Sequence, residues 1–180
     1  MTTLTPAAER LLTAASDLFY DRGIHAVGVD LIAEVAGTTK KTLYDRFGSK
    51  DNLVALYLSR RLERWNAFLT ERIDVVPAGE ARVLATFDVL AEWLAQNPWG
   101  CAFVNANAEI GRGAHPGIAV IREDKRRMRT LYEQLSGDQE LGARLHLLYE
   151  GAIVAHTSGG QHDAVSHAKA AARDLLAAAR

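Results

Sequence analysis

The stretch VDLIAEVAGTTKKTLYDRFGSKDNL, residues 29–53, decides the fold of this chain, because it predicts two short helices around a tight turn. A helix-turn-helix needs a small residue where the second helix crosses the first, a glycine able to take positive φ in the turn, and an apolar anchor in the second helix. Ala33, Gly37 and Leu43 meet these three needs. Three further apolar residues are expected to complete the small core: Ile32, Val35 and Phe47.

The second helix of this pair would offer polar side chains to a DNA groove. Leu43 and Phe47 lie four residues apart and share one face, so at about 100° per residue the side chains between them point away from the core. These outward positions are Lys41, Thr42, Tyr44 and Asp45. Thr38 and Thr39 place hydroxyls at the helix start, where free N–H groups favour anions. Lys50, in the first turn of the next helix, can reach the DNA backbone on the other side of the groove.

Charge is distributed unevenly along the chain. The 180 residues carry a net charge of −1, whereas residues 39–64 hold seven cations against three anions. The seven cations are Lys40, Lys41, Arg46, Lys50, Arg60, Arg61 and Arg64. A local basic patch on a near-neutral chain is typical of a protein that touches DNA with one end. We expect the last three arginines to form a solvated helix face rather than DNA ligands.

Composition excludes several other classes of protein. With 48% apolar residues, the chain can bury a core. The sequence has neither the long apolar run of a membrane span nor the basic and apolar N-terminus of a secretory signal. A cytoplasmic location is therefore expected. The single Cys101 excludes an intrachain disulfide and is expected to be a small buried hydrophobic residue. No metal is expected, because the histidines lack a tight ligand spacing, and no cofactor is expected either. Without a nucleophile and base pair, a phosphate loop or a metal set, the chain is not expected to be an enzyme.

The helical pattern continues to the C-terminus, which predicts an all-α fold. Sustained two-residue alternation of a half-buried strand is missing from the sequence. Expected helices cover residues 6–22, 29–36, 39–47, 50 to before Pro77, 80–96, 116–135, 139–157 and 162–179, with a looser segment over 97–114.

The run LFYDRGIHAVGVDLIAEVAGTTKKTLYDRFGSKDNLV, residues 18–54, resembles the DNA-binding domain of the TetR family of bacterial transcriptional regulators. The matching positions are Phe19, Gly23, Ile32, Ala33, Ala36, Gly37, Thr42, Leu43, Tyr44, Phe47, Lys50 and Leu53. The resemblance implies that an N-terminal three-helix helix-turn-helix domain, residues 1–52, is joined by a long helix to a C-terminal helical domain, residues 53–180. That second domain would dimerise and bind a small-molecule effector.

By the same resemblance, Thr39, Lys40, Thr42 and Tyr44 would contact DNA, with Tyr44 and Lys50 holding phosphates. Three positions depart from the family pattern: Gly28 replaces a Ser or Thr helix cap, Leu31 replaces a polar residue, and Lys41 stands where glycine is frequent. Two roles are open for Lys41, which could read guanine acceptors or neutralise a further phosphate.

Residues of the second half supply candidates for effector binding and for dimer formation. The ligand candidates combine aromatic positions with polar groups set in an apolar stretch: Trp93, Trp99, Phe103, Asn105, Asn107, Glu109, Met128, Tyr132 and Tyr149. For each of them, ordinary core packing is the competing role. The dimer faces are expected at Leu141, Leu145, Leu148 and Gly151 and at Ala168, Ala171, Leu175 and Ala178 or Ala179, because two copies would form a four-helix bundle.

The expected function is that of a homodimeric regulator that binds a palindromic operator in double-stranded DNA. A repressor released by a small effector is the first hypothesis. A DNA-binding regulator controlled by a protein partner, or without a small ligand, is the alternative. A cavity of about 300 Å³ or more would favour the effector.

Overall fold

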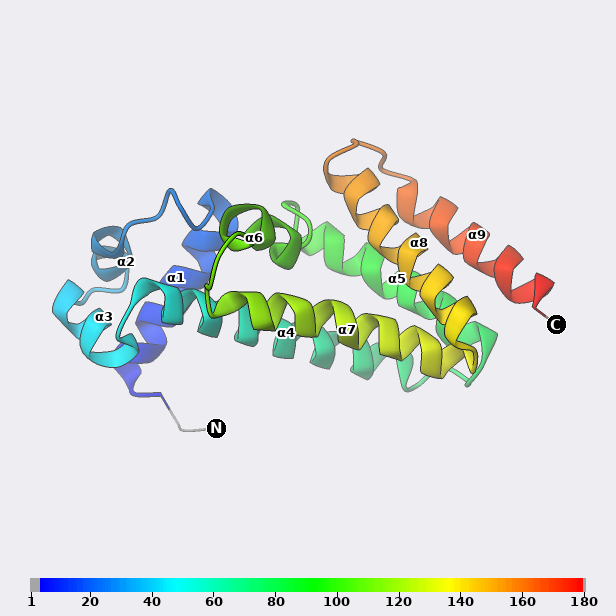
Figure 1. Ribbon diagram of the computed structural model, residues 1–180, viewed down its shortest axis with the longest axis horizontal. Helices are drawn as coiled ribbons and strands as arrows, with labels where there is room; N and C mark the ends of the chain where they lie inside the picture. Colours follow the sequence, from blue (N-terminus) through cyan, green and yellow to red (C-terminus); the bar gives the residue numbers. More distant parts are fainter. Residues whose placement is uncertain (1–3, 180) are drawn as a thin grey trace. The chain divides into compact units, whose positions relative to one another are not determined.

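The structure, a computed structural model, describes residues 4–179, and these residues form nine α-helices with no strand among them (Figure 1). The predicted all-α class is therefore confirmed. The helices are α1 (Pro6–Arg22), α2 (Val29–Val35), α3 (Lys40–Phe47), α4 (Lys50–Ile73), α5 (Glu80–Gln96), α6 (Ala102–Ile110), α7 (Gly117–Ser136), α8 (Gln139–Thr157) and α9 (Ala164–Ala178).

Local chemistry explains where the first helices begin and end. The Thr5 hydroxyl accepts a hydrogen bond from the N–H of Ala8, and Pro6 occupies the first turn of α1, where its missing N–H costs nothing. Gly23 ends that helix at φ 86°, a value that other residues rarely adopt. Ser49 accepts from the N–H of Asn52 at 3.0 Å and so caps α4.

The secondary structure predicted for one segment was wrong. Residues 97–114 were expected to be loose, but they contain the α6 helix. Phe103, Ala106 and Ile110 are buried at helical spacing along it, and this pattern was masked by the turn residues on either side.

The chain forms two compact units. One comprises the described part of Met1–Glu63 together with Ala102–Arg122, and the other comprises Arg64–Cys101 with Glu123–Arg180 as far as residue 179. The expected division into residues 1–52 and 53–180 stays a prediction, since α4 contributes residues to both units.

The second unit has an aromatic core. Trp65 packs edge-on against Trp93 at 5.1 Å between ring centroids, and Tyr149 lies 5.9 Å from Tyr132. The buried hydroxyl of Tyr132 pairs with that of Thr86 at 2.7 Å, which satisfies both polar groups inside the apolar core. Burial is also the main reason that the pKa of Tyr132 is raised.

Replacing either of two glycines of α8 by alanine should change the stability of the protein, in opposite directions. A Cβ at Gly142 would lie 2.5 Å from the Cα of Glu133, so Gly142→Ala should lower the free energy of unfolding by about 1.5 kcal/mol through overpacking. Nothing lies within 4 Å of a Cβ at Gly151, so Gly151→Ala should raise it by about 0.5 kcal/mol through helix propensity. Urea unfolding of both variants measures these changes. Unchanged or higher stability of Gly142→Ala would contradict the close approach to Glu133, and a loss in Gly151→Ala would contradict the open space at Gly151.

Candidate DNA interface

The first unit contains the helix-turn-helix core that the sequence predicts. Ala33 and Leu43 are buried, and Gly37 takes φ 59° in the turn between α2 and α3. Phe47 is also buried, but the expectation for Val35 was wrong, because its side chain is 57% exposed. Ile32, Ala33 and Ala36 mark the buried face, and at about 100° per residue Val35 lies roughly 110° away from it.

Side chains and backbone hold the turn in place. Thr39 caps α3, since its hydroxyl accepts from the N–H of Thr42 at 3.2 Å and also pairs with the Thr42 hydroxyl at 2.9 Å. Arg10 of α1 donates from Nε to the carbonyl of Ala36 at 3.2 Å. The role of Arg10 was not predicted from the sequence, because 26 residues separate it from its partner and no local pattern marks the pair.

The outer face of α3 is polar and exposed. Lys40, Lys41, Tyr44, Asp45 and Arg46 are all exposed, and the side chain of Tyr44 extends its ring into solvent with 43% of the residue accessible. Thr38 and Thr42 are half-buried and Thr39 is exposed. The structure thus brings six of the seven predicted DNA contacts together in one short segment: Thr38, Thr39, Lys40, Lys41, Thr42 and Tyr44.

Both lysines of this face are held by carboxylates. The Nζ of Lys41 donates to Oδ2 of Asp45 at 2.6 Å within α3, and the Nζ of Lys40 donates to Oδ2 of Asp30 of α2 at 3.1 Å. All four side chains are at least half exposed. Ion pairs of this kind contribute little to stability and exchange readily for other partners.

Lys50 and Glu109 meet at the loop between α1 and α2. The Nζ of Lys50 donates to the carbonyl of Ile24 at 2.6 Å, while Glu109 accepts from the backbone N–H groups of Ile24 at 2.8 Å and His25 at 2.6 Å. A Cβ at Gly23 would lie 3.2 Å from Oε1 of Glu109, so glycine leaves room for the carboxylate. Burial lowers the pKa of Lys50, although Glu109 and Asp51 oppose that shift. We refer to these five groups, Gly23, Ile24, His25, Lys50 and Glu109, as the loop clamp.

In the loop clamp, two residues that were predicted to bind DNA or a ligand form hydrogen bonds with the protein itself. Lys50, expected to hold a phosphate, is bound to the protein backbone in the structure. Glu109, expected to bind a ligand, is bound to the loop beside the helix-turn-helix. Its acidic side chain on the apolar α6 was a signal of a specific partner, but the sequence did not show which one.

The arginines that follow in α4 also contact protein groups. Arg60 forms a bidentate pair with Glu9 at 2.6 and 2.8 Å, and the guanidinium of Arg61 lies 4.4 Å from the ring of Tyr20. Arg64, in the second unit, lies 5.4 Å from the Trp93 ring. Arg60 and Arg61 are half-buried and Arg64 is exposed, so the expected solvated face is found at Arg64 alone. That none of the three contacts DNA stays a prediction.

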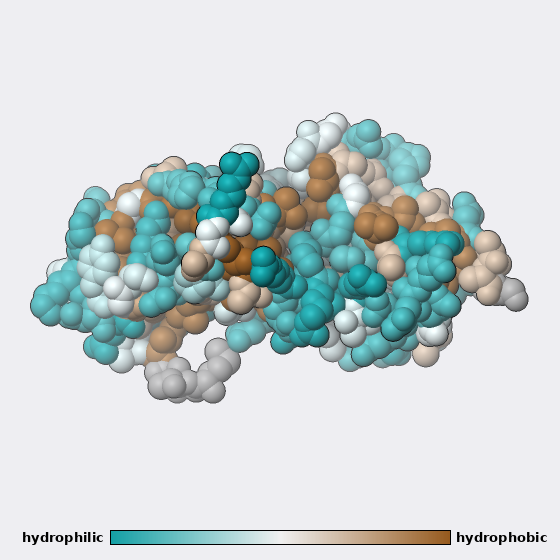
Figure 2. Space-filling view, viewed as in Figure 1, coloured by the Kyte–Doolittle hydropathy of each residue, from teal (hydrophilic) through white to brown (hydrophobic). Residues whose placement is uncertain are grey.

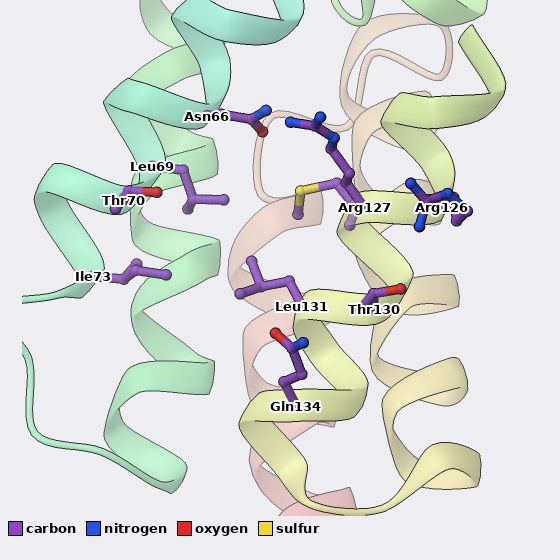
Figure 3. A pocket seen from close by; sticks show the side chains of 10 residues that line it. Asn66, Leu69, Thr70, Ile73, Arg126, Arg127, Thr130, Leu131 and Gln134 are labelled. Atoms are coloured by element: carbon purple, nitrogen blue, oxygen red, sulfur yellow. The ribbon is translucent and has the colours of Figure 1, made fainter. Parts of the chain in front are cut away.

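A groove in the second unit runs between α4 and α7, with a volume of about 420 Å³ (Figure 3). Leu69 and Ile73 of α4 face Leu131 of α7 across it, and Arg127 extends toward Asn66 at one end. The full lining is Asn66, Leu69, Thr70, Ile73, Arg126, Arg127, Met128, Thr130, Leu131 and Gln134.

Of the nine predicted ligand residues, Met128 lines this groove. Four others are buried in the apolar cores: Trp93, Phe103, Tyr132 and Tyr149. Trp99, Asn105 and Asn107 are exposed, and Glu109 belongs to the loop clamp. The groove was not identified from the sequence because its lining alternates polar and apolar residues on two helices far apart in the chain.

A buried group of charges also lies in the second unit. The Nζ of Lys125 is 2.9 Å from both carboxylate oxygens of Glu150, 3.3 Å from Oδ2 of the buried Asp124 and 3.5 Å from Sγ of Cys101. Burial raises the pKa of Asp124, although the ammonium of Lys125 opposes that shift. Cys101 was expected to be buried among apolar groups, but it is half-buried and accepts from a lysine.

Two further features of the described residues bear on function. Residues 4–179 include no group of three His, Cys, Asp or Glu side chains arranged as metal ligands. In the same part of the chain, no helix combines the length and the hydropathy needed to cross a membrane.

Comparison with known proteins points to a single family. The family model described as "Bacterial regulatory proteins, tetR family" matches residues 11–57. The HTH-type transcriptional activator FasR of Mycolicibacterium smegmatis is 31% identical over 98 residues, which are 54% of this chain and 45% of FasR. An uncharacterised HTH-type transcriptional regulator of Mycobacterium tuberculosis is 34% identical over 93 residues, or 51% of this chain and 46% of that protein. The matches therefore span less than half the length of these curated relatives.

Solved structures agree over nearly the whole chain. A TetR-family transcriptional regulator from Streptomyces coelicolor is 28% identical, with a TM-score of 0.86 over 95% of this chain and 94% of that one. The reduced form of NemR from E. coli shares the fold at 20% identity, with a TM-score of 0.81 over 94% of this chain and 97% of NemR.

Proposed function

Because this chain belongs to the TetR family of bacterial regulatory proteins, we propose that it is a transcriptional regulator that binds double-stranded DNA through α3. The observation that carries the proposal is the outer face of α3, where exposed lysines, a tyrosine and threonine hydroxyls project from a helix anchored by Leu43 and Phe47. A helix of this kind fits the major groove, with its exposed outer face turned toward the bases and phosphates.

Removing contacts from α3 tests the proposal. Lys40→Ala should weaken binding to all DNA sequences and reduce the slope of log affinity against log salt by about one, because one phosphate contact is lost. Tyr44→Phe should weaken binding uniformly through loss of its hydroxyl. Fluorescence anisotropy over a salt series measures both effects. The matched control is Arg173→Ala, which removes an exposed cation from α9. Equal losses in the control and in Lys40→Ala would refute the assignment.

We propose a homodimer as the DNA-binding form. Outward-facing apolar residues of α8 support it, since Leu147 is 70% exposed, Val154 is 47% exposed and Gly151 lies exposed between them. Figure 2 shows apolar side chains reaching the surface over this helix. Leu145, expected on the dimer face, is instead buried in the core, and the exposed residues of α8 lie about 100° around the helix axis from the predicted face. Two recognition helices about 34 Å apart would read a palindromic operator in successive grooves.

We propose that the groove between α4 and α7 binds a small-molecule effector. Its volume of about 420 Å³ falls within the range of about 300 to 1,000 Å³ usual for ligand pockets, and four apolar residues line it together with six polar ones, two of them arginines. Such a ligand would change operator affinity by about 5 to 150-fold. A regulator controlled by a protein partner is the competing proposal.

Filling the groove distinguishes the two forms of control. A small molecule that raises the melting temperature of the wild-type protein and alters its DNA binding should do neither in Leu131→Trp, because the indole would occupy the groove. A ligand whose effects persist in that variant would place its site elsewhere.

We propose that the protein acts as a repressor and that it is located in the cytoplasm. The relative FasR is named an activator, so the opposite sign of control is the alternative. A reporter gene fused to the target promoter distinguishes the two, because loss of a repressor raises reporter expression and loss of an activator lowers it.

A further inference from the structure

We propose that Lys41 and Asp45 act as a pair that selects one G·C base pair in each operator half-site. Lys41 would donate to the acceptors of guanine, and Asp45 would accept from the amino group of cytosine. This inference rests on the proposed function, because it requires α3 to lie in the major groove.

The geometry places both groups on the surface that would meet DNA. Lys41 and Asp45 lie one helical turn apart on α3, with side chains 84% and 56% exposed. The Nζ of Lys41 and Oδ2 of Asp45 are 2.6 Å apart. A pair this close reaches one base pair or two adjacent ones, rather than positions spread along the site.

The chemistry of the pair matches one base pair better than the others. An ammonium group only donates hydrogen bonds, and a carboxylate only accepts them. In the major groove, guanine offers N7 and O6 as acceptors, and the N4 amino group of its partner cytosine is a donor. An A·T pair also offers two acceptors, adenine N7 and thymine O4, and one donor, the adenine N6 amino group. The donor lies between the two acceptors there, so the lysine meets two adjacent acceptors only at guanine.

An acidic side chain on the outer face of α3 is not attracted to the DNA phosphates. A carboxylate repels the DNA backbone, so Asp45 lowers affinity for any sequence in which it finds no donor. It gains an interaction where a base amino group faces it. Asp45 therefore contributes discrimination between sequences more than affinity, as a repulsive element that the correct base pair neutralises.

A second lysine and aspartate pair supplies the matched control. Lys40 and Asp30 are also exposed and paired, at 3.1 Å, but Asp30 lies on α2 rather than on the outer face of α3. Asp30→Ala and Asp45→Ala remove the same charge and the same kind of ion pair. Only Asp45→Ala should alter which bases the protein selects.

The experiment is selection of bound duplexes from a randomised double-stranded DNA library, using the full chain and three variants: Asp45→Ala, Lys41→Ala and Asp30→Ala. The wild-type protein should select an inverted repeat with one dominant G·C position per half-site. Asp45→Ala and Lys41→Ala should both relax that position, with the preference for G·C over A·T falling about tenfold in direct titrations, while all other positions remain. Asp30→Ala should leave the selected sequence unchanged. Circular dichroism confirms that each variant is folded.

Three results would overturn the inference. An unchanged selected sequence for Asp45→Ala, with higher affinity for every duplex, would make Asp45 a repulsive charge only. Relaxation at different positions in the Asp45 and Lys41 variants would separate the pair. In either case sequence-selective binding by the wild-type protein would leave the proposed function standing. A wild-type protein that selects no sequence would refute the proposed function and the inference together.

Discussion

Replacing Lys125 by methionine should lower the free energy of unfolding by about 3 kcal/mol at neutral pH. The change leaves the buried Asp124 and the partly buried Glu150 without their shared cation, and removing one partner of a buried ion pair costs about 3 to 5 kcal/mol. We expect the lower end of that range because the Lys125 side chain is 28% exposed. Chemical denaturation followed by circular dichroism measures the loss.

The loss should depend on pH in a defined direction. Burial raises the pKa of Asp124 above its ordinary value, so the folded state binds a proton more tightly than the unfolded state, and this carboxyl lowers stability as pH rises through that window. Burial also opposes ionisation of Glu150, but His146 and Lys125 outweigh it and hold the pKa of Glu150 below its ordinary value. Without Lys125 both carboxyls protonate more easily, so the variant should lose less stability near pH 4 than at pH 7.

The control for this prediction is Arg144→Met. Arg144 pairs with Glu140 one turn away on α8, and both side chains are exposed. Its loss should change the free energy of unfolding by less than about 0.5 kcal/mol at either pH. Equal losses for the Lys125 and Arg144 variants would contradict the account of the buried charges.

Replacing Glu109 by glutamine should lower the free energy of unfolding by about 2 kcal/mol. The carboxylate accepts from two backbone N–H groups of the loop between α1 and α2, and charge-assisted bonds of this kind contribute about 1.5 to 3 kcal/mol. An amide retains one acceptor oxygen and turns a donor toward the second N–H. It also removes the negative charge that favours the ammonium form of Lys50.

Operator binding by the Glu109 variant should weaken as well, because the clamped loop leads directly into α2 of the helix-turn-helix. The matched control is Glu71→Gln, whose side chain is 79% exposed, and it should leave both stability and DNA binding near wild-type values. Full stability with unchanged DNA affinity in Glu109→Gln would show that the loop is held without the carboxylate.

Much of the fold could be read from the sequence because it depends on local rules. Thr5 and Pro6 marked the start of α1, and the apolar spacing in residues 80–96 and 139–157 gave the bounds of α5 and α8. The helix-turn-helix core followed from Ala33, Gly37 and Leu43, whose spacing is fixed by the crossing of two short helices. Val35 was misplaced because a helix of seven residues has no repeat from which to determine its buried face.

Interactions between distant segments could not be read in the same way. Glu109 lies 85 residues from Ile24, and no local pattern links them. The groove likewise draws Leu69 and Leu131 from two helices whose pairing depends on tertiary packing. Most aromatic candidates proved to be core residues, because burial of a large apolar ring and lining of a ligand site produce the same spacing in the sequence.

The most direct test of the central claim compares the affinity of the purified chain for its selected DNA duplex with its affinity for a scrambled duplex of equal length and salt concentration. The account predicts two chains bound per palindromic site and at least about a thousandfold preference for the selected duplex. Equal affinity for the two duplexes would contradict it.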